Sequence, residues 1–589
     1  MHTHRIVTAC LLFASVLGIA PAQVMALPAP LVLAAPEAPS TTRTYPGAAP
    51  CNTTLQACIS ASANGDTVLI AAGTYVTNSL SITRAVSLIG NGVSPSSVKL
   101  RPSSGRMIQY DAASITASTV ISNMTIENGN TGLSTGGGIR VASGGAPLFH
   151  SLVISNNTSI GGGGIRIIPT VDVTLTNVTL FSNTASGNGG GISTVAGKLT
   201  LLNSQVLSNS AGTNGGGISS GGPLVISNTL ILTNTASGSG GGVFGFQAVN
   251  VFRGSINKNK AAIGGGLFVA TGMNLTLEGG IDSSNRLAIT DNAATAGNGG
   301  GAHADGPVKI FGDTLFASNT ATGEGGALYV HDLTDDFPNN IVLSWIINTS
   351  GGNGGAVRAL GTVNLCPSRP QFLGNHAGDG TNADGGGIYA DGAIFLCGGG
   401  SLSNANTARF GGAYYSKQSV TLNGHDMGAN TAQSGGCVFS EGSILFNSSD
   451  TNGCKASADG GAANGITVTI QGNGVAFFQN NTAGGAGGVA RGVVISISNA
   501  TLFSNTAATG GAAQGVFITA TNASFTANRA TNGGAISATN SLIASSGFTS
   551  NVALFQGGGL FGTSNAIIQD SRFFSNTAIV CCNGEGGGA

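Results

Sequence analysis

The chain has 589 residues, of which 97 are glycine, and its 22 basic and 23 acidic side chains give a formal net charge of −1. Only 8% of the residues are charged, which excludes the basic surface that binds nucleic acid and an acidic interaction tail. The 41% of hydrophobic residues can build a core, and the glycines lack the every-third-residue period of collagen, so the composition predicts a folded chain.

Residues 1–26 have the pattern of a secretory signal peptide. A basic start, MHTHR, precedes an apolar run from Ile6 to Ala20, and the small residues of VMA at 24–26 offer a cleavage site. The Ala/Pro-rich residues 27–50 are predicted to form a linker. No other stretch has the roughly 18 uninterrupted apolar residues of a membrane-spanning helix. We therefore expect an exported chain, secreted or on the cell surface, without a transmembrane segment.

Residues 51–120 are predicted to form an N-terminal cap and the first coils of a repeat structure. In this stretch Leu55, Cys58 and Ile59 fall on one face of a short helix, with Asn52 or Thr53 as its N-cap. Such a helix covers the open end of an apolar column, which would otherwise expose strand edges and core residues. This opening resembles that of pectate-lyase-like β-helices.

Residues 121–589 consist of a repeat whose most regular feature is an asparagine before a glycine cluster, as in NTASGNGGGI at 183–192. The spacing of these asparagines lies between 22 and 33 residues, which indicates one structural unit per repeat. Between them, apolar residues alternate with period two and no helical period appears, so each unit is predicted to be two or three short strands. The expected corner residues are Asn157, Asn183, Asn209, Asn234, Asn259, Asn292, Asn319, Asn348, Asn375, Asn404, Asn430, Asn452, Asn480, Asn505, Asn528, Asn551 and Asn576.

This pattern predicts an all-β parallel β-helix with coils of about 25 residues, in which each strand pairs with its equivalent one repeat later. The corner asparagines can then stack as a ladder of amide hydrogen bonds, and the glycines allow positive φ and close approach of neighbouring coils. A phosphate-binding loop requires a helix after the glycines, and none follows here.

The repeats resemble those of the chlamydial polymorphic outer membrane proteins, which carry G-G-A-[ILV] and F-x-x-N motifs. GGAL begins at Gly325, GGAV at Gly354 and GGAI at Gly533. The phenylalanines that begin F-x-x-N in register are Phe316, Phe372, Phe477, Phe525, Phe548 and Phe573. The two resemblances imply a right-handed β-helix of pectate-lyase-like fold, and the second implies an adhesive passenger displayed on an outer membrane.

Eight cysteines follow the signal peptide, and in an exported chain an even number indicates disulfides over zinc. Cys51 and Cys58 would connect the ends of the cap. Cys366 and Cys397 precede their corner asparagines by similar distances, so they are near-equivalent on adjacent coils. A bond between Cys437 and Cys454 is possible but out of register, and no pairing follows for the remaining two cysteines, Cys581 and Cys582.

Catalytic candidates are few. His303 lies 11 residues after Asn292 and His331 lies 12 after Asn319, so the two imidazoles are expected to stack on adjacent coils. Neighbouring groups could complete a patch that binds a cation or a sugar acid, or these residues could be an ordinary solvated loop. The neighbouring groups are Asp305, Asp332, Asp335, Asp336 and Arg358.

Two further patterns suggest binding modules. Asp379, Asp384 and Asp391 lie in a Gly/Asp-rich stretch similar to calcium-binding loops, with ordinary Asp-Gly turns as the alternative. Threonine follows many corner asparagines, as in an ice-binding surface, although Lys260, His376 and several alanines interrupt the column.

Three functional hypotheses follow, and the fold alone does not select among them. The first is an adhesive or structural surface protein without catalytic activity or cofactor, which would contact a cell-surface, glycan or matrix ligand. The second is a polysaccharide lyase or hydrolase on the same scaffold, and the third is a calcium- or ice-binding module. The chain stops within the glycine cluster after Asn576, which predicts that the solenoid is incomplete at its C-terminus.

Overall fold

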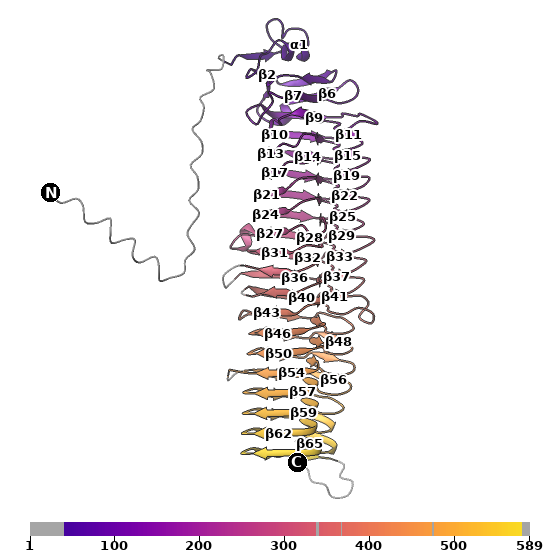
Figure 1. Ribbon diagram of the computed structural model, residues 1–589, viewed down its shortest axis with the longest axis vertical. Helices are drawn as coiled ribbons and strands as arrows, with labels where there is room; N and C mark the ends of the chain where they lie inside the picture. The colour runs from indigo at the N-terminus through magenta and orange to yellow at the C-terminus, as the bar shows by residue number, and fades with distance from the viewer. Residues whose placement is uncertain (1–39, 337–340, 367, 474–475, 580–589) are drawn as a thin grey trace, which may run out of the picture. The chain divides into compact units, whose positions relative to one another are not determined.

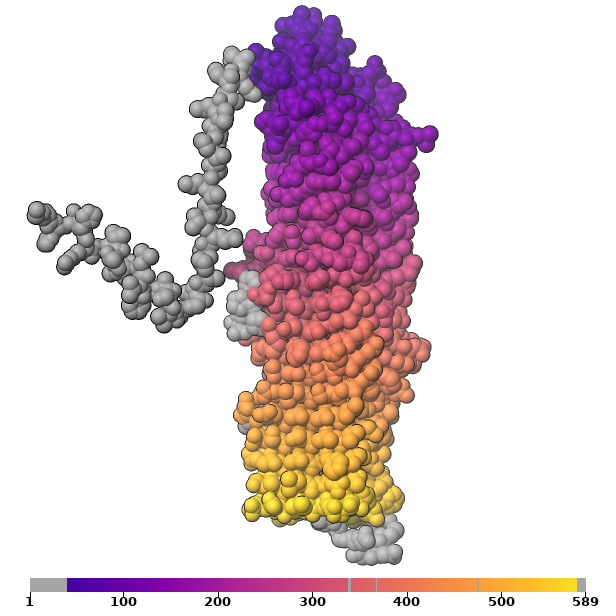
Figure 2. Space-filling view, viewed as in Figure 1, coloured from indigo at the N-terminus to yellow at the C-terminus, as the bar shows by residue number. Residues whose placement is uncertain are grey.

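A computed structural model of the chain describes residues 40–336, 341–366, 368–473 and 476–579. From Thr41 onward the chain forms one unit of short strands stacked coil upon coil (Figure 1). The predicted parallel β-helix of all-β class is confirmed, and successive coils appear as consecutive bands of colour in Figure 2. The predicted signal peptide, Cys581 and Cys582 lie outside the described residues.

The coil that follows Asn183 is typical. It contains four strands, which are β15 (Thr184–Ala185), β16 (Ile192–Thr194), β17 (Leu199–Leu202) and β18 (Gln205–Leu207). Alternate residues such as Ile192, Leu199 and Leu201 are fully buried, because side chains of a pleated strand point to opposite faces in turn. The period-two pattern in the sequence therefore becomes an inner apolar face on every coil.

Each strand pairs in parallel with its equivalents on the two neighbouring coils. Strand β16 lies between β12 (Ile165–Ile167) and β20 (Ile218–Ser220), and β17 lies between β13 (Val173–Thr176) and β21 (Leu224–Leu232). The same pairing begins with β1 (Thr42–Tyr45) on β2 (Thr67–Ala71) and continues to β64 (Val552–Gln556) on β67 (Thr577–Ala578). The inner faces form one continuous apolar column from Cys51 to Leu560.

The first strand lies inside the stretch that the sequence assigned to a linker. Thr42 to Tyr45 pair in register with Thr67 to Ile70, and Tyr45 packs against the apolar column. The Thr-Arg-Thr-Tyr segment contains two β-branched residues and one aromatic residue, which favours a strand. The folded unit consequently begins before residue 51.

Helix α1 (Leu55–Ser60) buries Leu55, Cys58 and Ile59 and contacts β4 (Leu80–Ile82). Its N-cap is Thr54, whose hydroxyl accepts a hydrogen bond from the Ala57 amide at 3.1 Å, so neither expected cap residue caps it. Cys51 and Cys58 form a disulfide, with 4.4 Å between their Cα atoms. Within the described ranges, no helix is long and apolar enough to cross a membrane.

The corner asparagines form a ladder inside the solenoid. Asn183 is fully buried, and its Nδ2 donates to Asn209 Oδ1 at 3.0 Å and to the Ile154 carbonyl at 2.8 Å. Its Oδ1 accepts from the backbone amide and the Nδ2 of Asn157, at 3.1 and 2.9 Å. The Asn183 side chain therefore makes four hydrogen bonds, which satisfies an amide group that has no access to water.

The ladder differs from the expected register on three coils. The rungs are Asn406 instead of Asn404, and Asn481 instead of Asn480, while Cys454 takes the place expected for Asn452. The residue before each of these rungs has positive φ, at Ala405, Asn480 and Gly453. Asparagine tolerates positive φ, so it can occupy the residue before the rung as well as the rung itself. Where two asparagines lie close together, the sequence pattern does not show which one is the rung. For the same reason Phe478 is the buried aromatic of its coil, and Phe477 is 42% exposed.

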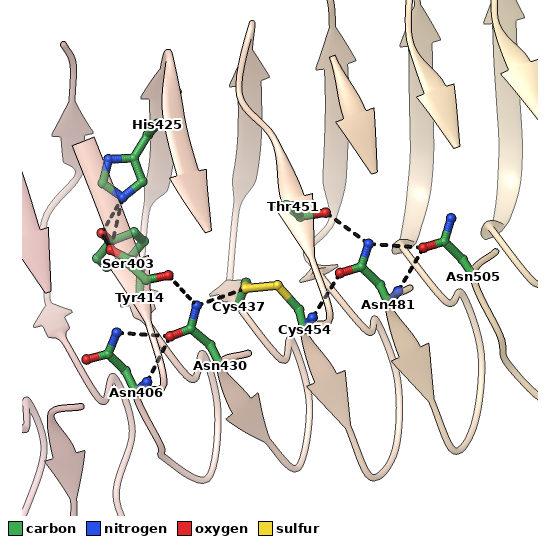
Figure 3. The surroundings of a disulfide bond; sticks show 10 residues. All are labelled: Ser403, Asn406, Tyr414, His425, Asn430, Cys437, Thr451, Cys454, Asn481 and Asn505. Carbon is green, nitrogen blue, oxygen red and sulfur yellow. Dashed lines mark hydrogen bonds between the residues drawn. A yellow bond between two sulfur atoms is a disulfide. The ribbon is translucent and has the colours of Figure 1, made fainter. Parts of the chain in front are cut away.

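The third disulfide replaces one contact of the ladder (Figure 3). Cys437 follows Gly436 in the glycine cluster, and it bonds Cys454 at the rung position of the next coil, with Cα atoms 5.5 Å apart. Asn430 Nδ2 donates to Cys437 Sγ at 3.1 Å, and the Cys454 amide donates to Asn481 Oδ1 at 3.0 Å. The pair joins non-equivalent positions that touch, which is why it looked out of register. Cys366 and Cys397 are also bonded, with Cα atoms 4.8 Å apart.

The glycine clusters bring neighbouring coils into close contact. Gly189 has a φ of +68°, and a Cβ on Gly190 would lie 2.4 Å from the Gly216 carbonyl oxygen of the next coil. A Cβ on Gly191 would lie 3.3 Å from the Asn209 side chain. These positions therefore require glycine for backbone conformation and spacing between coils.

Candidate ligand-binding face

Eight adjacent coils place a ring or a guanidinium at the same outward position. Each residue is the middle one of a three-residue strand whose two neighbours point inward, so its side chain points to the outer face. The strands are β23 (Val243–Gly245), β26 (Leu267–Val269), β30 (Ala302–Ala304), β34 (Leu328–Val330), β38 (Val357–Ala359), β42 (Ile388–Ala390), β45 (Tyr414–Ser416) and β49 (Val438–Ser440). We call their middle residues the aromatic column: Phe244, Phe268, His303, Tyr329, Arg358, Tyr389, Tyr415 and Phe439.

The rings of the aromatic column stack on one another. Ring centroids are 5.3 Å apart between Phe244 and Phe268, and 4.6 Å apart between Tyr389 and Tyr415, with nearly parallel planes. The Arg358 guanidinium carbon lies 4.6 Å from the centre of the Tyr389 ring. These spacings follow from the separation of paired strands, about 4.8 Å. Because each face covers the next, little of the column remains exposed: His303, Arg358, Tyr389 and Tyr415 keep only 6–7% of their surface, and the other four rings are half-buried.

An ion-pair network runs beside the column. Arg358 contacts Glu324 Oε2 at 3.3 Å and Asp391 Oδ2 at 2.7 Å, and Lys417 contacts the other oxygen of Asp391 at 2.6 Å. Burial opposes ionisation of Asp391, but hydrogen bonds from Lys417 and Arg358 outweigh it and lower the pKa of this carboxyl. The Tyr415 hydroxyl donates to Glu441. Glu324 and Asp391 are thus neutralised by cationic groups, and Glu441 is hydrogen-bonded by Tyr415.

His303 lies in the aromatic column between Phe268 and Tyr329, with ring centroids 5.0 and 4.7 Å away. Its Nε2 is 3.1 Å from Asp305 Oδ1. Burial lowers the pKa of His303, and the Asp305 carboxylate only partly compensates. Burial thus favours the neutral form of the imidazole, which is shielded on both faces.

The expected stacking of His303 on His331 is not present. Tyr329 is the register partner of His303, while His331 lies two residues further along, exposed, with Nδ1 2.7 Å from Asp332 Oδ2. The loop between corner and glycines has one residue more after Asn292 than after Asn319. Counting from the corners therefore gave the wrong partner, because the glycines and not the corners fix the register of these strands.

Asp335 and Asp336 belong to another side of the coil. Asp335 ends β35 (Leu333–Asp335), is buried, and accepts the Ser368 amide at 3.1 Å; burial raises its pKa. Asp336 lies 3.2 Å from Lys309 Nζ, and both side chains are exposed. The predicted patch is therefore divided: His303 contacts Asp305 and His331 contacts Asp332, while Asp335 and Asp336 have other partners.

The three aspartates of the expected calcium loop also have separate partners. Asp379 is exposed and accepts the Thr381 amide at 2.9 Å. Asp384 binds Arg409 through both oxygens and accepts the Phe410 amide at 3.2 Å, and Asp391 belongs to the network around Arg358. Among the described residues, no group of three His, Cys, Asp or Glu side chains is arranged to hold a metal ion.

The threonine column is in register but mixed. Thr158, Thr184, Ser210 and Thr235 are successive partners, and Lys260 and Ala293 follow. Further along the same side, a groove of about 860 Å³ is lined by further hydroxyl groups and by Lys455; its threonines include Thr407, Thr431 and Thr482.

Comparison with known proteins gives no relative. No family model, no curated protein and no solved structure matches the chain. The resemblances to chlamydial outer membrane repeats and to pectate-lyase-like proteins are therefore unsupported beyond the β-helix itself.

Most members of the aromatic column were not identified from the sequence. Of its members, only His303 and Arg358 stood out, because charged residues are rare in this chain. The available signal was positional: an aromatic residue recurs two places after the last small residue of the glycine cluster, as in GGGVF and GGALY. Only strand register shows that these residues touch.

Proposed function

We propose that this chain is an exported, surface-displayed β-helix with an adhesive or structural role and without catalytic activity. The observation that carries the proposal is the aromatic column, an outward row of stacked rings and paired charges on eight adjacent coils, in which Phe244, Phe268, Tyr329 and Phe439 are the half-buried members. An extended, rigid row suits a long ligand or a partner surface, because many weak contacts add without ordering a flexible loop.

Three disulfides support export. Cys51–Cys58, Cys366–Cys397 and Cys437–Cys454 tie the cap to itself and adjacent coils to each other. Disulfides of this kind persist in oxidising compartments and are rare in the cytosol. Secretion or display on the cell surface, as the N-terminal pattern predicts, agrees with them.

A polysaccharide lyase or hydrolase is the second candidate. The observation in its favour is the His303–Asp305 contact on the same face as Arg358. Catalysis by Arg358 would require a guanidinium free to stabilise developing charge, yet Arg358 already binds two carboxylates. The calcium- and ice-binding alternatives rank lower, since Asp384 and Asp391 are paired with cations and Lys260 interrupts the threonine column.

The test is a binding screen of the purified chain on a glycan array and on matrix proteins, with a parallel assay for polysaccharide cleavage. Tyr329→Ser is the informative variant, because the chain itself has Ser193 and Ser219 at the equivalent position of earlier coils. Phe181→Ser is the control, since Phe181 is 42% exposed and lies outside the aromatic column.

We expect binding without cleavage, a loss of about tenfold in affinity for Tyr329→Ser, equal to about 1.4 kcal/mol, and little change for Phe181→Ser. Formation of a cleaved product that requires His303 would establish the enzyme instead. Equal losses of affinity in Tyr329→Ser and Phe181→Ser would show that the aromatic column is not the binding surface.

A further inference from the structure

Three arginines lie together on the coils that precede the aromatic column, where Ser193 and Ser219 hold the same outward position between Arg166 and Phe244. Arg140 on β9 (Ile139–Gly144) and Arg166 on β12 are register partners on adjacent strands. Arg106 precedes β7 (Ile108–Ala112), and its Nη1 donates to Gln109 Oε1 at 2.7 Å. Arg140 Nη1 lies 3.5 Å from the same oxygen. The two guanidinium groups therefore meet at one neutral acceptor, Gln109 Oε1.

None of the three has an acidic partner among the described residues. Other half-buried arginines differ: Arg101 binds Glu127, Arg286 binds Asp313 and Arg409 binds Asp384. The nearest acid along the strand, Asp111, pairs in register with Ser143 and accepts its hydroxyl. In a chain with 22 basic and 23 acidic residues, three adjacent unneutralised arginines are a costly arrangement.

Burial and the repulsion between the arginines lower the pKa values of two of them. Burial and the charge of Arg140 lower the pKa of Arg106 to about 10, and the same two causes lower the pKa of Arg166. Donor capacity is also unused. A guanidinium has five N–H donors, but within the described residues the side-chain hydrogen bonds of Arg140 and Arg166 go only to Gln109 and to Ser193, and Nε of each is buried without a partner. Arg106 is more fully bonded, since it also donates to Ser134 and to the carbonyls of Gly136 and Thr135, so the free donors belong to Arg140 and Arg166.

We propose that Arg106, Arg140 and Arg166 form a binding site for a doubly charged oxyanion, sulfate or phosphate, either free or as an ester on a polymer. Guanidinium groups bind such oxyanions through two parallel N–H···O bonds, and the planar fork matches their geometry. Three positive charges favour a ligand of charge −2 over a single carboxylate, because the attraction grows with the charge. The proposal does not depend on the aromatic column or on the proposed adhesive role.

The hydroxyl groups around the cluster fit the same ligand. Arg106 Nη2 donates to Ser134 Oγ at 3.1 Å, and Arg166 donates to Ser193, whose register partner on the next coil is Ser219. Hydroxyls can donate to sulfate or phosphate oxygens while the guanidinium groups hold its charge. The backbone of the site is a pair of sheet strands, which keeps the arginines at fixed spacing before a ligand arrives.

The experiment compares Arg140→Gln with Arg101→Gln in the full chain. Both variants lose one positive charge near the N-terminal end, but Arg101 is neutralised by Glu127 at 2.6 Å. Binding of sodium sulfate, sodium phosphate and sodium acetate is measured by calorimetry and by the shift of the melting midpoint, with sodium chloride at equal ionic strength as reference. We expect sulfate and phosphate to raise the midpoint of the wild type and of Arg101→Gln, and Arg140→Gln to bind them at least about tenfold more weakly.

The two variants also differ without ligand. Arg140→Gln removes repulsion, so its melting midpoint in chloride is expected to rise, whereas Arg101→Gln breaks an ion pair and its midpoint is expected to fall or stay unchanged. A raised midpoint together with lost sulfate binding separates a ligand site from a damaged fold. If Arg140→Gln melts lower than the wild type and binds sulfate normally, the arginines are structural and the proposal fails.

Further arms identify the source of the oxyanion. The affinity for dextran sulfate is compared with the affinity for dextran and with the affinity for inorganic sulfate. Tighter binding of dextran sulfate, lost in Arg140→Gln, assigns a sulfated polymer as ligand, and equal affinity assigns the free ion. Binding of acetate as tight as that of sulfate, or no effect of sulfate beyond that of chloride, overturns the proposal.

Discussion

Removing one rung of the asparagine ladder tests the explanation of the fold directly, and Asn375 is the best rung for this purpose. It is fully buried, and its Nδ2 donates to Asn406 Oδ1 at 3.0 Å and to the carbonyl of Trp345 at 2.9 Å. Trp345 is the only tryptophan of the chain and is fully buried between Phe316 and Phe372. Its fluorescence therefore reports on the coil in which the rung is removed.

The expected cost follows from the groups that Asn375→Ala leaves without partners. Asn375 Oδ1 accepts from the backbone amide of Asn348 at 3.0 Å and from its Nδ2 at 2.9 Å. A buried donor without a partner costs about 1–3 kcal/mol, so two orphaned donors cost about 2–6 kcal/mol. Asn406 Oδ1 keeps the backbone amide of residue 375 as donor and adds little.

The assay is urea unfolding of Asn375→Ala, followed by Trp345 fluorescence and by circular dichroism, because long repeat arrays need not unfold in one step. The control is Asn274→Ala, since Asn274 is exposed and a substitution there should change the free energy of unfolding by less than about 0.5 kcal/mol. If Asn375→Ala unfolds at the same urea concentration as Asn274→Ala, the ladder does not stabilise the solenoid and this account of the corners is wrong.

Two more predictions concern the coils around residue 430. Reduction of the Cys437–Cys454 bond, which closes a 17-residue separation, is expected to cost the wild type about 3 kcal/mol of unfolding free energy. The double variant Cys437→Ala/Cys454→Asn restores an asparagine at this rung, so its unfolding free energy should fall less when dithiothreitol is added. Equal falls in the two proteins, measured by urea unfolding with and without dithiothreitol, would contradict this. Complete burial lowers the pKa of His425 to about 3, so the unfolded chain, with a pKa near 6.5, binds a proton that the folded chain rejects. The contribution of His425 to stability is therefore full above about pH 6.5 and falls toward pH 3, by at most about 5 kcal/mol. A pH series of urea midpoints should show a steeper fall in the wild type than in His425→Gln, in which the carboxyl groups still titrate.

His425 also shows how the column accommodates a polar cluster. Its Nε2 lies 2.9 Å from Ser403 Oγ and 2.8 Å from the Tyr414 hydroxyl, all three side chains being fully buried. The Asn430 side chain donates to the Ser403 carbonyl at 2.9 Å, so the cluster adjoins the ladder at the coil where the disulfide replaces a rung (Figure 3). Nothing in the local sequence separates this histidine from an exposed one.

Much of the fold could be predicted because it depends on features within one coil that recur from coil to coil. The period, the alternation of apolar residues, the corner asparagines and the glycine clusters are each local requirements of one coil, and stacking repeats them. The Cys51–Cys58 and Cys366–Cys397 bonds could be predicted for related reasons, since the first spans one short segment and the second joins near-equivalent positions on adjacent coils.

The sequence by itself therefore determined the repeat, the strand alternation and most rungs of the ladder, because each depends on residues within one coil. Only the tertiary structure decided that Asn406 and not Asn404 is a rung, that His303 meets Tyr329 and not His331, and that Arg140 lies against Arg166. These outcomes depend on strand register, and register changes when a loop gains a single residue. The neighbours of an outward side chain are fixed by backbone pairing between coils about 25 residues apart, which no local pattern specifies.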